Sequence, residues 1–131
     1  MSDPAFLWSL MCDHFLIDQA GKQSFIGVFD RIGAVAFPAV QRSLYIAVAL
    51  AGEPNDSVPA LLDVWSPDGA LLVSTPESRL QFSQAGRAMF VNLLFDLQLP
   101  VTGQYSVTVE AGGKPVATFQ FEVYLVQGAS A

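Results

Sequence analysis

The chain has 131 residues, the size of one domain, and carries a formal net charge of −6 at pH 7. Its six basic residues are scattered along the sequence, which argues against binding to a nucleic-acid backbone. Its longest apolar stretches fall far short of the ~20 residues that a membrane-spanning helix needs.

Hydrophobic residues make up 52% of the chain and charged residues only 14%, against about 25% charged in an average soluble domain. Some strands must therefore carry apolar side chains on both faces. We expect the surplus apolar surface to meet a second sheet, another copy of the chain or a protein partner.

The first segment, residues 6–17, is predicted to be a strand that is apolar on both sides at its start. The run before the single cysteine, Cys12, lacks the basic residues of a secretory signal. A lone cysteine also fits a reducing compartment. These features predict a cytoplasmic protein with no membrane span.

A turn at residues 19–22 leads into a return strand at residues 23–32, which makes a hairpin with the first strand. Gly33 and Pro38 then mark a crossing between sheets, because proline cannot donate to a strand ladder.

In the strand at residues 43–51, the alternation of side chains distinguishes the two faces most clearly. One face carries the branched residues Leu44, Ile46, Val48 and Leu50, and we expect it to face the core. The other face carries Tyr45, Ala47, Ala49 and Ala51, which are too apolar and too small for ordinary solvent exposure. We predict that these four residues contact either a loop or another subunit, and they are our candidate interface.

Further strands are predicted on both sides of a tight Ser66-Pro67-Asp68-Gly69 turn, and then at residues 89–97, 105–110 and 117–125. About eight strands in all indicate an all-β, antiparallel two-sheet sandwich of the Greek-key immunoglobulin-like kind, with a closed barrel as the structural alternative. We expect a single domain over residues 1–131, ordered over about 5–126 and with a flexible tail at 127–131.

Several segments resemble an uncharacterised bacterial domain-of-unknown-function family of stand-alone β-sandwich proteins of about this length: residues 11–14, 17–22, 25–32, Phe37-Pro38 and 100–123. The shared residues are turn and core residues, so the resemblance implies a fold and no activity. Gly103-x-Tyr105 also looks like the tyrosine corner of immunoglobulin-like domains, although the flanking cysteines are missing.

Cys12 and His14 would share a strand face and could act as nucleophile and base. We instead expect a core cysteine beside a hydrogen-bonded histidine, because i and i+2 side chains on a strand lie too far apart for a direct hydrogen bond. The pair also supplies too few ligands for zinc. We therefore predict no enzyme activity, no catalytic residue, no metal site and no cofactor.

Two ligand classes remain as alternatives. Calcium could be held by acidic residues near strand ends: Asp56, Asp63, Asp68, Glu77 and Asp96. A carbohydrate could stack on aromatic residues: Trp8, Tyr45, Trp65 and Tyr124. Either ligand would bind at a loop end of the sandwich, such as residues 52–57 or 75–86.

The leading hypothesis is a non-enzymatic interaction or assembly module that self-associates or docks a protein partner through an apolar strand face. A small-ligand-binding sandwich is the alternative.

Overall fold

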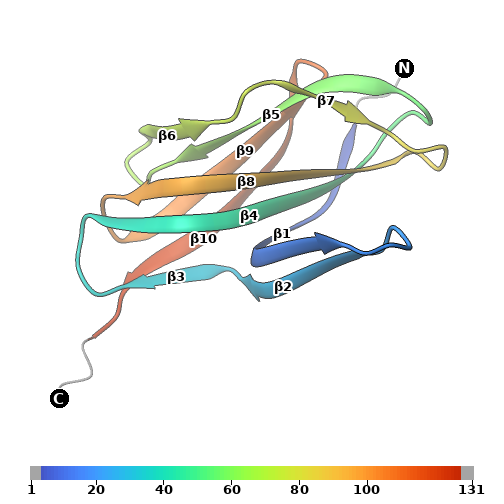
Figure 1. Cartoon of the computed structure of the whole chain (residues 1–131). Helices are drawn as coiled ribbons and strands as arrows, with labels where there is room; N and C mark the ends of the chain where they lie inside the picture. Colours follow the sequence, from blue (N-terminus) through green and yellow to red (C-terminus); the bar gives the residue numbers. More distant parts are fainter. Residues whose placement is uncertain (1–3, 128–131) are drawn as a thin grey trace.

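The computed structural model describes residues 4–127 and folds them into ten strands without a helix. Figure 1 shows that the strands form two facing sheets. One sheet has four strands in the order β2-β1-β4-β8: β1 (Ala5–Ile17), β2 (Gln23–Phe29), β4 (Ala39–Ala51) and β8 (Arg87–Leu99). The other has the order β3-β10-β9-β5-β6, with β7 also paired to β5: β3 (Arg31–Ala34), β5 (Ser57–Trp65), β6 (Leu71–Ser74), β7 (Ser78–Gln81), β9 (Gly103–Ala111) and β10 (Lys114–Leu125).

The predicted all-β two-sheet sandwich is confirmed, with ten strands where about eight were expected. The two additional strands are short. β3 was merged into the predicted strand at residues 23–32, but the chain changes sheets at Asp30, and β3 pairs in parallel with β10. β7 lies within residues 75–86, which were expected to form a loop, and it pairs with β5. The return to the four-stranded sheet comes at a cis Phe37–Pro38 peptide, where a crossing was predicted.

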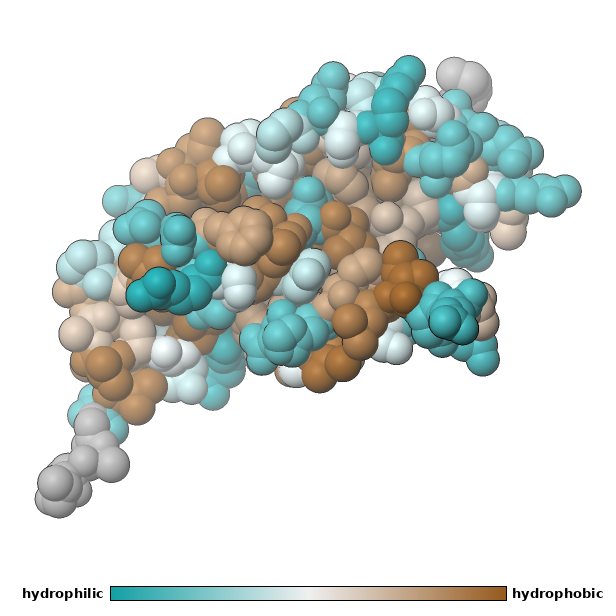
Figure 2. Space-filling model, viewed as in Figure 1, coloured by the Kyte–Doolittle hydropathy of each residue, from teal (hydrophilic) through white to brown (hydrophobic). Residues whose placement is uncertain are grey.

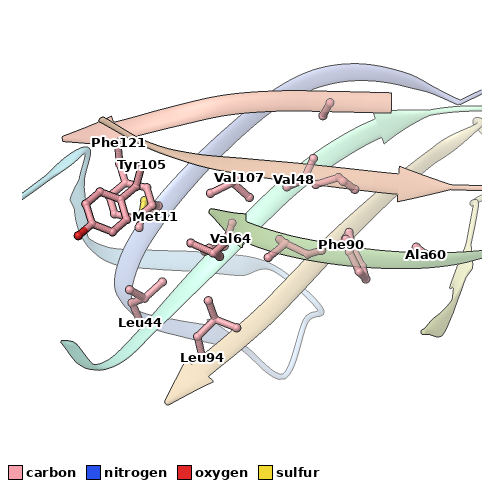
Figure 3. Close-up of a cluster of buried hydrophobic side chains, with 14 of the residues drawn as sticks. Met11, Leu44, Val48, Ala60, Val64, Phe90, Leu94, Tyr105, Val107 and Phe121 are labelled. Atoms are coloured by element: carbon pink, nitrogen blue, oxygen red, sulfur yellow. The ribbon is translucent and has the colours of Figure 1, made fainter. Parts of the chain in front are cut away.

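The core lies between the two sheets, and the branched face of β4 is at its centre. Leu44, Ile46, Val48 and Leu50 are all fully buried, as the alternation predicted. The opposing sheet supplies buried branched side chains from β5 and β9: Leu62, Val64, Val107 and Val109. Figure 3 shows several of these side chains meeting between the ribbons. Their contact with one another removes both inner faces from water, which is the main stabilisation of a sandwich.

Tyr105 closes one end of this core as the predicted tyrosine corner. Its hydroxyl donates a 2.6 Å hydrogen bond to the Val101 carbonyl and accepts a 3.2 Å bond from the Val101 N–H. The ring is fully buried and stacks on Phe121, with 5.3 Å between ring centroids. One side chain thereby fixes the β8–β9 turn to the core.

The predicted flexible tail at 127–131 lies, apart from residue 127, outside the described residues.

Candidate functional site

β1 pairs first with β4 and then with β2, and this change of partner positions the candidate site. Residues 5–12 pair with β4, whereas residues 11–17 pair with β2. Figure 1 shows the β1–β2 hairpin turning away from the path that β1 follows beside β4. Gly27 sits at the hairpin position opposite Asp13, with a φ of 73°. A Cβ there would lie 2.6 Å from Asp13 Oδ2, so only glycine leaves room for this carboxylate.

The turned hairpin explains the alanine row of β4. Ala47 is 0% exposed and Ala49 is 5% exposed, while Tyr45 and Ala51 are partly buried. A loop or another subunit was predicted to contact this row, and in the structure the β1–β2 hairpin of the same chain lies beside it. A partner could reach the two central alanines only if the hairpin moved.

Four aromatic rings, which we call the ring row, connect the hairpin to the sheet: Trp8, Phe25, Phe15 and Tyr45. Successive ring centroids are 6.0, 5.2 and 6.0 Å apart. Trp8 pairs with Ala49 in the ladder, so the ring row begins beside Ala49 and ends at Tyr45, with Ala47 between them. From this arrangement we infer that the small side chains of β4 leave room for the phenylalanine rings.

The opposite side of the hairpin is exposed and apolar. Leu16, Ile26 and Val28 are 54%, 48% and 58% exposed. The ladder places them on one side with His14, because His14 pairs with Ile26 and Cys12 with Val28. We call Leu16, Ile26 and Val28 the hairpin face. The hairpin face was not predicted from the sequence, although β2 carries apolar residues on both of its sides, which is a signal of such a surface.

The apolar surface also extends along β8, the other edge of this sheet. Leu93 pairs with Tyr45, and Phe95, two residues further on, is 68% exposed. Figure 2 shows brown side chains over the hairpin and along β4 and β8, with teal residues mainly around them. Neither β2 nor residues 88–95 of β8 contain a charged residue. Open sheet edges usually carry charges that prevent pairing with another strand, and these two edges lack them.

Cys12 and His14 do not meet through their side chains. The buried Cys12 thiol donates to the backbone carbonyl of His14 at 3.3 Å, while the His14 side chain is exposed. Burial, reinforced by the charge of Asp13, raises the pKa of the Cys12 thiol. The thiolate that a nucleophile requires is therefore disfavoured.

The two loops considered for calcium lie together at one end of the sandwich. The Gln81 side-chain amide donates to the carbonyls of Asn55, Asp56 and Phe82, which occupies these oxygens. The Asp56 carboxylate accepts from the N–H of Ser57. Within residues 4–127, no three His, Cys, Asp or Glu side chains lie where they could hold a metal ion together.

The remaining acidic candidates are dispersed. Asp68 accepts from the Ser66 hydroxyl and the Ala70 N–H, and these bonds lower the pKa of its carboxyl. Asp63 lies within β5, with its Oδ1 buried and unpaired, and Asp96 lies in β8 with a φ of 52°.

The four aromatic candidates for a carbohydrate platform lie on different sheets. Trp8 and Tyr45 belong to the ring row of the four-stranded sheet. Trp65 and Tyr124 belong to the six-stranded sheet, where the guanidinium of Arg31 covers Tyr124 at 4.3 Å from the ring centroid. Trp8 lines a pocket with a largely apolar wall and Arg87 at its border, whereas Trp65 borders a groove lined mainly by uncharged polar side chains.

Comparisons with known proteins agree with this architecture. A family model described as a family of unknown function, DUF6941, matches residues 7–124. No curated protein matches the chain. The part of the chain that the structure describes contains no helix able to cross a membrane.

Among solved structures, the alkylpurine DNA glycosylase AlkC of Pseudomonas fluorescens, bound to DNA containing an abasic-site analogue, is similar over 88% of this chain, with 10% identity and a TM-score of 0.53. The chain spans only 30% of that enzyme. An immunoglobulin-like protein from Pseudomonas aeruginosa is 15% identical, with 93% of this chain and 97% of the other covered and a TM-score of 0.49. At these identities the likeness concerns the fold alone.

Proposed function

Since the chain belongs to the DUF6941 family, whose function is unknown, its role must be inferred from its own surfaces, and we propose that it is a non-enzymatic module that pairs with a second copy of itself. The contact is made by the hairpin face. The observation that carries this proposal is the exposure of Leu16, Ile26 and Val28, each about half exposed, on an edge hairpin. Apolar groups clustered in this way gain free energy when a partner removes them from water.

Electrostatics restricts where two copies can meet. Each chain carries a net charge of −6, so two copies repel one another over most of their surfaces. β2 contains no charged residue and therefore offers a place where two copies can approach. A free strand edge also presents alternating donors and acceptors, which match those of an identical antiparallel strand about a twofold axis.

The absence of catalysis is part of the proposal. It is supported by the burial of the Cys12 thiol, its raised pKa and its bond to a backbone carbonyl. A cytoplasmic location is also proposed, on the ground that a single buried cysteine suits a reducing compartment.

The proposal is tested by measuring solution mass with light scattering over a concentration series. We expect the wild-type mass to approach twice 14.1 kDa as the concentration rises. Val28→Glu should hold the mass at 14.1 kDa, because it places a like charge at the centre of the contact.

Val35→Glu is the matched control, since Val35 is a still more exposed valine (77%) in the β3–β4 loop. It should leave the association intact. A wild-type chain that stays monomeric throughout, or an equal loss of association in both variants, would refute self-association through the hairpin.

A further inference from the structure

The six-stranded sheet has a groove of about 530 Å³ on its outer face, on the opposite side of the molecule from the hairpin face. Its size lies within the range of small-ligand sites. The turn after β5 forms one border, and polar side chains of β9 and β10 form the floor together with Trp65: Gln104, Ser106, Thr108, Thr118 and Gln120. Among residues 4–127, no charged side chain lines this groove, although the chain has 12 acidic residues.

The strand register places the groove residues in ordered rows. Trp65 pairs with Ser106, and Ser106 pairs with Gln120, so an indole, a hydroxyl and an amide follow one another across β5, β9 and β10. Asp63, Thr108 and Thr118 form the neighbouring row, so one carboxylate lies beside the groove. Directly paired side chains in an antiparallel sheet start about 5 Å apart, so one small ligand can contact all three members of a row.

The Trp65 ring is held in place. Its Nε1 donates a 2.9 Å hydrogen bond to Thr108 Oγ1. Because this donor is already used, Trp65 would contact a ligand through the face of its indole ring. Within residues 4–127, the side chains of Ser106, Thr118, Gln104 and Gln120 make no hydrogen bond. On its β9 and β10 side, an oriented ring therefore borders neutral donors and acceptors that are free to bind a ligand.

We propose that this groove binds a neutral carbohydrate. A sugar ring has an apolar C–H face that can lie against the indole, and hydroxyl groups that can exchange hydrogen bonds with uncharged amides and hydroxyls. The lack of basic side chains in the groove, together with the net charge of −6, disfavours nucleotides, phosphates and acidic sugars. The site is independent of the hairpin face, so either proposal can fail without the other.

The chain has only two tryptophans, which gives a direct assay. In a Trp8→Phe background, Trp65 is the sole indole, and its emission is titrated with cellohexaose, maltohexaose and mannohexaose. We expect a saturable change with at least one of them. The double substitution Ser106→Ala with Gln120→Ala should weaken that binding about tenfold or more, because it removes two hydrogen bonds to the ligand.

The control is Gln23→Ala with Ser24→Ala, which removes the same two residue types from β2 on the other sheet and should leave the affinity unchanged. Circular dichroism of each variant checks that it folds. The inference is overturned if no probe gives a saturable change up to about 10 mM, beyond the range of weak specific binding. Equal weakening by the control pair would overturn it as well.

Discussion

Two side chains at one end of the sandwich fix a pair of neighbouring turns. Asp68 bonds to Ser66 and Ala70 inside the turn after β5, and Tyr105 bonds to Val101 inside the turn before β9. The turns are in contact, because a Cβ on Gly103 would lie 2.9 Å from Pro67 Cγ. Both turns were readable from the sequence, since local rules of proline, glycine and aspartate chemistry govern them.

Tyr105→Phe should destabilise the domain by about 1 kcal/mol at pH 7, the value of one net hydrogen bond. Burial, and secondarily the charge of Asp68, raise the pKa of the Tyr105 hydroxyl. The folded state thus favours the neutral phenol, and this stability is present below the ordinary tyrosine pKa of about 10 and lost as pH rises through the raised value.

Urea unfolding at pH 7 and about pH 11 checks the expectation for Tyr105. The difference between wild type and Tyr105→Phe should shrink at the higher pH. A constant difference would mean that ionisation of Tyr105 is not coupled to folding.

Among the strands, the β1–β2 hairpin has a position that could not be predicted from the sequence. Alternation in β4 was sufficient to assign Leu44 and Ile46 to the core and to mark Ala47 and Ala49 as covered by something. It could not identify the cover, because the ring row joins residues from three strands and depends on the turn of β1. β3 and β7 were missed because each has only four residues and is fixed by distant partners.

Ala47→Leu should separate the hairpin from the sheet. The larger side chain must displace the rings of Phe15 and Phe25, at a cost of about 1–3 kcal/mol for overpacking. In a Trp65→Phe background, Trp8 emission should move to longer wavelength because Trp8 loses its 6.0 Å contact with Phe25.

Ala60→Leu is a matched control for Ala47→Leu, since Ala60 is a buried alanine of the other sheet. It should destabilise the fold without changing Trp8 emission in the native state. Unchanged Trp8 emission in Ala47→Leu would contradict the inference that the hairpin packs on the alanine row.

For the whole molecule, apolar surface and net charge have opposite effects on association in solution. The apolar hairpin face favours association, while the net charge of −6 opposes it. Salt shortens the range of the repulsion to about 8 Å at physiological ionic strength. It does not reduce the free energy gained by burying apolar surface.

Dimer formation should therefore strengthen as salt is raised from about 20 to 300 mM, by several-fold in the association constant. Light scattering at fixed protein concentration measures it. Weaker association at high salt would point to attraction between charges in place of apolar contact.

The parallel pairing of β3 with β10 also constrains the order in which the domain can be assembled during synthesis. Arg31 meets Glu122 at 2.8 Å, 91 residues later in the chain. β2 can already pair with β1 when β3 leaves the ribosome, but β3 has no strand to join until β10 is made. The nascent chain must keep one edge segment unpaired through nearly all of its translation, and closure of the six-stranded sheet is a late event.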